Sequence, residues 1–183
     1  MKAADRILQK WRIAKAAPHI PRGARILDIG SADGALFRAL GHAHESSIGI
    51  DPTLPRHAAV GRFRMIAGYF PQDLPTAEPF DVIAMLATLE HFPPATYEEL
   101  GRGCAQYLKP GGKLIITVPS PAVDGILKIL HALRLIDGMS LEEHHGYDVN
   151  HTTRIFAEEF FILRRRAAFQ LGLNNLFVFE RRT

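Results

Sequence analysis

The chain has a single cysteine, Cys104, among its 183 residues. One cysteine forms neither an internal disulfide nor a cysteine-based zinc site, so a reducing compartment is expected. The sequence also lacks an apolar run long enough to span a bilayer, and it opens with a charged amphipathic stretch instead of a signal peptide. We therefore expect a cytoplasmic protein with no membrane span.

A large excess of charge of one sign is also missing. The formal net charge is +3 and the isoelectric point is near 9.2, which permits anionic partners without requiring them. This balance gives nucleic-acid binding little support. With 47% hydrophobic residues, the chain is the size of one compact domain with an ample core. Residues 1–183 are therefore expected to form a single domain. The sequence does not indicate the oligomeric state.

One stretch, residues 25–34 with the sequence RILDIGSADG, organises the chain. Its apolar run ends at Gly30, and an amphipathic segment with Leu36, Phe37 and Leu40 on one side begins at Gly34. This pattern predicts a buried strand that turns sharply into a helix. At the carboxyl edge of an α/β sheet, such a turn meets nucleotide-like ligands.

Short apolar runs and helical spacings alternate along the rest of the chain. Strands are expected at residues 47–51, 63–66, 81–86 and 113–118, and helices at 3–16, at 97–108 and, after residue 121, at 126–135. In the first helix, Ile7, Leu8, Trp11 and Ala14 are expected to pack on the domain. The alternation predicts an α/β fold, a three-layer α/β/α sandwich around a Rossmann-like, doubly wound and mostly parallel sheet.

The C-terminal region shows a different pattern. Helical spacing of Phe156, Phe160, Leu163 and Ala167 predicts a further helix, which would carry Arg164–Arg166 in solvent. Two apolar runs then flank Asn174-Asn175, which predicts a terminal antiparallel hairpin turning at these asparagines.

The glycine turn lacks two features of a diphosphate site. In the pattern G-x-G-x-x-[GA] the middle glycine would be Ala32, and the turn has no lysine. It carries instead Asp28 and Asp33, which repel a pyrophosphate and suit a ligand with ammonium and sulfonium charges. A nicotinamide dehydrogenase, the alternative that predicts NADH binding, is therefore disfavoured.

These residues resemble the class I S-adenosylmethionine-dependent methyltransferases. Asp28, Gly30 and Gly34 resemble the family's first motif, and Asp51 is similar to the acid that accepts both ribose hydroxyls. Residues 80–92, FDVIAMLATLEHF, resemble the fourth-strand motif of the subgroup that includes ubiquinone-biosynthesis O-methyltransferases. Residues 108–121, LKPGGKLIITVPSP, resemble the stretch entering its next strand.

The resemblance implies S-adenosyl-L-methionine as cofactor and a small molecule as methyl acceptor. Oxygen is favoured as the acceptor atom, because residues 86–89 read LATL where many nitrogen methylators have Asn/Asp-Pro-Pro-Tyr. The usual acid after the third strand is absent, so stacking, backbone donors, Gln72 or Asp73 would hold the adenine. The implied cofactor-binding residues are Asp28, Gly30, Ser31, Gly34, Asp51, Pro52, Tyr69 and Leu86.

Each role has a simpler alternative. Asp51 would otherwise cap a following helix, and Asp28 would satisfy nearby backbone N–H groups. His91 either faces the acceptor or bonds a neighbouring loop. Together with His144 and His145 it forms the set of candidate general bases.

The segment of residues 122–155 is expected to cover the acceptor, whose identity its composition does not specify. No metal is expected, because the polar residues of this segment match no ligand spacing; they are Glu143, His144, His145, Asp148 and His151. Cys104 is expected in the core. The competing function is an adenosyl-cofactor-binding partner or regulatory subunit with the same fold and no turnover.

Overall fold

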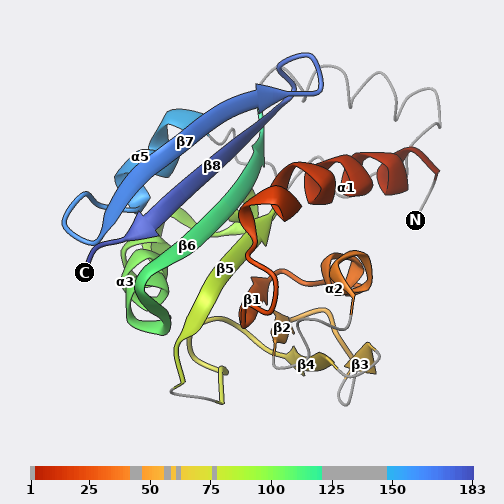
Figure 1. Cartoon of the computed structure of the whole chain (residues 1–183), viewed down its shortest axis with the longest axis horizontal. Coiled ribbons are helices and arrows are strands. Elements are labelled where there is room, and N and C mark those ends of the chain that lie inside the picture. Colours follow the sequence, from red (N-terminus) through yellow and green to blue (C-terminus); the bar gives the residue numbers. More distant parts are fainter. Residues whose placement is uncertain (1–2, 42–46, 56–58, 61–62, 76–77, 121–147) are drawn as a thin grey trace.

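The computed structural model describes residues 3–41, 47–55, 59–60, 63–75, 78–120 and 148–183 (Figure 1). Its helices are α1 (Ala3–Ala16), α2 (Ala35–Leu40), α3 (Tyr97–Tyr107) and α5 (Thr152–Ile155). Its strands are β1 (Ile26–Ile29), β2 (Ile48–Asp51), β3 (Ala59–Val60), β4 (Phe63–Ala67), β5 (Phe80–Leu86), β6 (Leu108–Pro119), β7 (Phe161–Phe169) and β8 (Asn174–Arg181). Short 3-10 turns are η1 (Ala17–His19), η3 (Leu89–His91), η4 (Pro94–Thr96) and η5 (Val149–His151).

The strands form one sheet in the order β3-β4-β2-β1-β5-β6-β8-β7. Strands β4, β2, β1, β5 and β6 pair in parallel, and β8 runs antiparallel to both β6 and β7. The carboxyl ends of the parallel strands therefore meet at one edge. The predicted Rossmann-like fold with an antiparallel C-terminal hairpin is confirmed.

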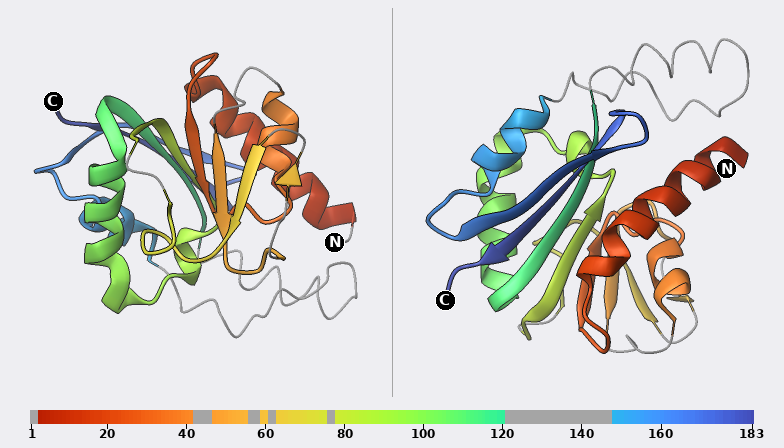
Figure 2. Two further views of the ribbon diagram at one scale, coloured as in Figure 1. Left: turned by 90° about the horizontal axis from the view of Figure 1, so that it is seen from below. Right: turned by 45° about the horizontal axis from the view of Figure 1, so that its top comes forward.

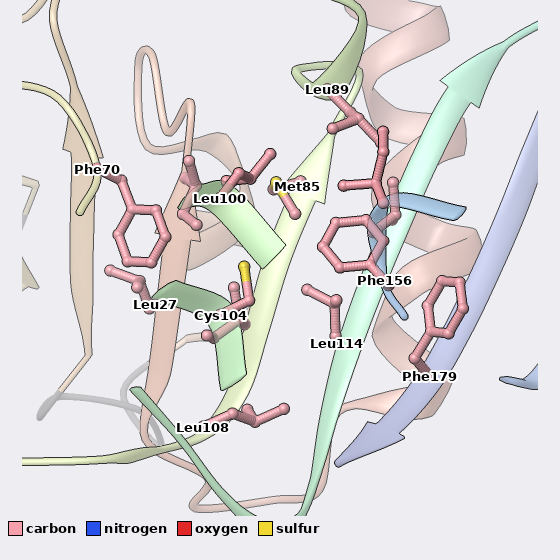
Figure 3. Close-up of a cluster of buried hydrophobic side chains, with 14 of the residues drawn as sticks. Leu27, Phe70, Met85, Leu89, Leu100, Cys104, Leu108, Leu114, Phe156 and Phe179 are labelled. Atoms are coloured by element: carbon pink, nitrogen blue, oxygen red, sulfur yellow. The ribbon is translucent and has the colours of Figure 1, made fainter. Parts of the chain in front are cut away.

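Helices cover both faces of the sheet, with α3 and α5 on one side and α1 and α2 on the other (Figure 2). The central parallel strands β1, β2 and β5 are largely apolar and buried on both faces, as parallel strands between two helical layers must be. On the α3 side, Leu27, Met85 and Leu114 pack against Leu100 and Phe156 (Figure 3). On the α1 side, the strands pack against residues that include Ile13 and Phe37.

Cys104 lies in the core on the α3 side, as predicted. Its side chain is fully buried, and burial raises the pKa of its thiol. The thiolate that a nucleophile needs is therefore disfavoured.

The prediction of a helix with a face of Phe156, Phe160, Leu163 and Ala167 is wrong. Residues 161–169 form β7, which pairs along its length with β8. A spacing of three or four apolar residues also fits a strand, and here the long-range pairing decides. Arg164–Arg166 accordingly lie exposed on the outermost strand and not on a helix.

The predicted position of the hairpin turn is also wrong. Asn174 and Asn175 begin β8 and are buried, while the turn lies at residues 170–173. Gln170 and Leu171 adopt φ of +53° and +56° there, followed by Gly172 at +84°. The turn therefore places two residues, Gln170 and Leu171, in the left-handed region, which their residue types do not predict.

Helix α1 ends before Pro18 as predicted, but it buries a different face. Ile7 is 54% exposed and Trp11 is 53% exposed, whereas Ile13 and Ala16 are buried. The helix carries apolar residues on more than one side, so its sequence does not select one face. Arg12, in the same helix, is half-buried.

Among the described helices, none combines the length and the apolar character needed to cross a membrane. The predicted helix at residues 126–135 lies outside the described part of the chain.

Candidate functional site

Gly30, directly after β1, brings the glycine turn against the end of β5. Its φ is +75°, in the left-handed region that favours glycine. A Cβ at this position would lie 2.3 Å from both Cγ2 and Oγ1 of Thr88. Both its backbone conformation and its neighbour therefore require a glycine.

The turn continues through two further left-handed residues, Ala32 with φ of +42° and Gly34 with φ of +71°. Ala32 therefore stands in a conformation that glycine adopts more readily. The N–H of Gly34 donates to the carbonyl of Ser31 at 2.7 Å, and α2 begins at the next residue.

The backbone N–H groups of the turn are used within the protein. Those of Gly30 and Ser31 donate to the carbonyl of Ile50 at 2.9 and 3.4 Å. That of Ala32 donates to Oδ2 of Asp51 at 2.9 Å. The amides that cradle a phosphate in dinucleotide sites therefore serve here to join β1 to β2.

Two buried acids lie at the carboxyl ends of these neighbouring strands. Asp28 is 4% exposed, and burial, together with the charges of Asp51 and Asp33, raises the pKa of its carboxyl to about 8. Ionising Asp28 in the folded protein therefore costs free energy, and a nearby cation would offset that cost. The site favours a positively charged ligand over an anionic one.

The carboxylate of Asp51 accepts hydrogen bonds from two turns, the glycine turn after β1 and the turn after β2. Its Oδ1 accepts from the backbone N–H of Thr53 at 2.8 Å and from its hydroxyl at 2.5 Å, and its Oδ2 accepts from Ala32. The residue thus serves a turn, not a helix as the capping alternative supposed. Since each carboxylate oxygen accepts two bonds, Oδ2 keeps one acceptor position.

The other predicted cofactor-binding residues lie around the same edge. Ser31 is buried, and among the described residues no partner reaches its Oγ. Pro52 is exposed beside Asp51, and Leu86 is half-buried at the tip of β5. Tyr69 is 66% exposed, which leaves its ring open for stacking.

The two polar candidates for the adenine already have partners. Asp73 accepts at Oδ2 from the backbone N–H of Tyr69 at 2.8 Å. Gln72 donates to Oε1 of Glu99 at 2.8 Å, which ties it to α3. Stacking and backbone donors therefore remain the better fit of the alternatives predicted for this position.

A buried carboxyl group lies just beyond β5. Glu90, in η3, is 2% exposed, and burial raises its pKa to about 7, opposed by its own backbone N–H and by the charge of Arg12. Within the part of the chain that the structure describes, no donor reaches its Oε2. The local sequence does not indicate that Glu90 is buried, because its burial depends on neighbours from other elements.

Arg12 comes to the same edge from α1. Burial lowers the pKa of its guanidinium, against the charges of Glu90 and Asp5. Its Nε donates to Oδ1 of Asn174 at 3.4 Å. The predicted face of this helix, with Ile7, Leu8, Trp11 and Ala14, did not include Arg12. The helical spacing of Leu8, Arg12 and Ala16 was the signal that could have indicated its burial.

Of the predicted catalytic histidines, the structure describes only His91. It is half-buried in η3, next to Glu90. His144 and His145 lie outside the described residues, as does Glu143. In the described part of the same segment, Asp148 accepts from the backbone N–H of Asn150 at 2.9 Å, and His151 is exposed.

Known proteins share both sequence and fold with this chain. A family model described as a methyltransferase domain matches residues 3–158. A ubiquinone biosynthesis O-methyltransferase of Xylella fastidiosa (strain 9a5c) is 34% identical over 108 residues, covering 52% of this chain and 42% of that protein. A tRNA U34 carboxymethyltransferase of Methylococcus capsulatus is 34% identical over 119 residues, covering 58% and 36%.

A solved structure is similar over most of its length. It is the 1,6-didemethyltoxoflavin-N1-methyltransferase of Burkholderia thailandensis, with bound 1,6-didemethyltoxoflavin and S-adenosylhomocysteine. The TM-score is 0.67 at 18% identity, covering 96% of this chain and 78% of that one, which shows a shared fold. By contrast, the chain spans less than half the length of the two curated relatives.

Proposed function

Because this chain belongs to the family of methyltransferase domains, we propose that it binds S-adenosyl-L-methionine and transfers the methyl group to the oxygen of a small-molecule acceptor. The resemblance in its motifs to that family is thereby confirmed. The observation that carries the proposal is the pair of buried acids, Asp28 and Asp51, beside a turn whose amides are already used. Such a site suits an adenosyl sulfonium and disfavours a diphosphate.

The residues present fit this cofactor. Asp28 would face its positive charges, and the remaining acceptor position of Asp51 would serve the ribose. The left-handed Gly30 and Gly34 shape the turn that would lie beside the methionine part of the cofactor. Tyr69 and Pro52 would lie along the adenine.

Bound S-adenosylmethionine supplies a methyl group that its sulfonium already activates. The chain's part is to align the acceptor and exclude water, because the positive charge diminishes as the methyl group moves. Half-buried Leu86 would lie by the sulfur end. A base is needed where the acceptor must lose a proton, and His91, His144 and His145 are the proposed candidates.

Further parts of the proposal concern the whole chain. We place the acceptor beneath residues 122–155, of which 122–147 lie outside the described residues. Residues 1–183 would form one domain. A cytoplasmic location is supported by the single, buried Cys104.

Calorimetric titration with S-adenosylhomocysteine and with NADH tests the cofactor. We expect binding of the first and none of the second; the opposite result overturns the proposal. Incubation with methyl-labelled S-adenosylmethionine and a metabolite extract then tests turnover. Binding without transfer of label to any small molecule would favour the regulatory-subunit alternative.

A second candidate acceptor is a tRNA base. It is favoured by the relative named tRNA U34 carboxymethyltransferase, which is as similar to this chain as the O-methyltransferase is. The same labelling experiment with total tRNA decides: label that ribonuclease releases from the polymer fraction identifies this acceptor.

A further inference from the structure

Polar side chains gather on the α1 side of the sheet, at its carboxyl edge. Side chains alternate along a strand, so Thr117 shares the face of Ile115, and Asn174 that of Leu176, both of which pack on the α1 side. Thr117 is fully buried, and no described partner reaches its Oγ1. An apolar core position thus carries an unsatisfied hydroxyl at the place where acceptor and cofactor would meet.

Arg12 and Glu90 face this place from different elements. Both α1 and η3 contact β6, and Arg12 also reaches Asn174 at the start of β8. Each influences the other electrostatically, yet among the described residues no ion pair joins them. Arg12 donates a long hydrogen bond of 3.4 Å to Asn174, and within the described part of the chain no donor reaches Oε2 of Glu90.

A buried carboxylate and a half-buried guanidinium that form no ion pair with each other are costly unless a third group connects them. That group must donate one hydrogen bond to Glu90 and accept another from Arg12. A hydroxyl does both. A carboxylate ligand would be repelled by Glu90, and an ammonium ligand by Arg12.

We propose that Arg12 and Glu90 bracket the acceptor hydroxyl, with Glu90 as the proton acceptor and Arg12 as the donor to the acceptor oxygen. This inference rests on the proposed function and gives it a second set of residues besides the histidines. Helix α1 thereby becomes part of the active site.

The transfer step then balances. The acceptor oxygen forms a bond to the methyl carbon, and the carbon–sulfur bond breaks with its electron pair remaining on sulfur. The hydroxyl proton passes to Oε2 of Glu90. One positive charge on sulfur and one negative charge on Glu90 disappear together, while Arg12 stabilises negative charge on oxygen during proton loss.

Two groups interact electrostatically with Glu90, Arg12 from α1 and Tyr97 from α3, and His91 follows it in the same turn. Arg12 favours the ionised carboxylate, while burial opposes it. Transfer is therefore expected to rise with pH as Glu90 loses its proton, near pH 7 in the free protein.

The test uses 4-nitrophenol with protein saturated by S-adenosylhomocysteine, because the phenol and its phenolate differ in visible absorbance. Glu90→Gln keeps the side-chain shape and removes the negative charge, and Arg12→Met keeps much of the volume and removes the positive charge. We expect the bound probe to ionise at lower pH in E90Q and at higher pH in R12M, each displaced at least tenfold in proton concentration. Lys10→Met, on the exposed side of α1, should leave the titration unchanged.

Two further readouts separate the possible failures. Calorimetry should find S-adenosylhomocysteine affinity within about twofold of wild type in E90Q and R12M, which also shows that both fold. With methyl-labelled cofactor and the same probe, E90Q should slow transfer about a hundredfold, the lower range for loss of a general base. If both variants bind S-adenosylhomocysteine and titrate the probe as the wild type does, the bracket is overturned while the proposed function stands. If wild type binds no S-adenosylhomocysteine, both fail.

Discussion

Replacing Asp28 by asparagine should stabilise the free protein and weaken its binding of cofactor. The carboxyl is 4% exposed, and its pKa in the folded protein is raised to about 8 from an ordinary 3.8. An acid with a raised pKa binds its proton more tightly when folded than when unfolded. Stability is therefore lost as pH rises from about 4 to about 8, and asparagine, neutral in both states, avoids this loss.

The magnitude follows from the two pKa values. Each pH unit between them changes the free energy of unfolding by about 1.4 kcal/mol. Allowing for partial ionisation near each end, the gap in unfolding free energy between Asp28→Asn and wild type should widen by roughly 3.5 kcal/mol between pH 5 and pH 8. Other titrating groups are common to both proteins and cancel.

Urea denaturation at several pH values measures this gap. Glu159→Gln, at an exposed acid just before β7 and away from this turn, is the control, and its gap should stay constant within about 0.5 kcal/mol because exposed charges contribute little. Binding of S-adenosylhomocysteine should release a proton near pH 7 in wild type, as Asp28 ionises to face the ligand's ammonium, and none in Asp28→Asn. If the difference in unfolding free energy between Asp28→Asn and wild type does not change with pH, Asp28 is not a buried acid that a bound cation would stabilise in its ionised form.

Three further changes test the remainder of the site. Gly30→Ala should lower S-adenosylhomocysteine affinity at least tenfold, because its Cβ would lie 2.3 Å from Thr88. Gly23→Ala, at a similar φ of +77° with nothing within 4 Å, should lower only the free energy of unfolding, by the backbone cost of about 1–2 kcal/mol. Equal losses of affinity in the two variants would exclude the clash with Thr88 as the cause. Asp51→Ala should weaken binding of the same ligand by about 1.5–3 kcal/mol in calorimetry, the scale for hydrogen bonds to a charged acceptor; unchanged affinity would exclude the ribose role. His91→Ala should leave that affinity nearly intact and slow methyl transfer, so a wild-type rate would take His91 off the catalytic list.

The parallel half of the sheet could be predicted from sequence because its strands are short, apolar and bounded by turn residues. The runs that end at Ile29, Asp51 and Leu86 form strands buried on both faces of the sheet. Few other secondary structures fit such short apolar runs. Their order along the chain and the glycine turn then placed Asp28 near Asp51 at one edge. Thus the cofactor half of the candidate site followed from local patterns.

The antiparallel half depended on contacts that local patterns do not contain. Phe156, Phe160 and Leu163 fit a helical period, and only pairing with β8 makes residues 161–169 a strand. Asn174-Asn175 reads as a turn, yet the left-handed residues are Gln170 and Leu171. In such cases the tertiary partner, absent from the local sequence, decides the structure.

Arg12 and Glu90, which we propose bracket the acceptor, could not be found from local patterns for a related reason. Arg12 and Glu90 are 78 positions apart in the chain (90 minus 12), and each looks ordinary beside its sequence neighbours. Their importance comes from burial at a shared edge, which depends on the packing of α1. His144 and His145 lie outside the described residues, so their predicted roles stay predictions.

The two ends of the sheet have a consequence for self-association. The outermost strand on one side, β3, has two residues, and on the other side β7 presents Arg164, Arg165 and Arg166 to solvent. A short border and a positively charged border are both poor templates for a strand from another copy. Growth of this sheet from molecule to molecule is thus discouraged in both directions, and neutralising the three arginines should promote aggregation.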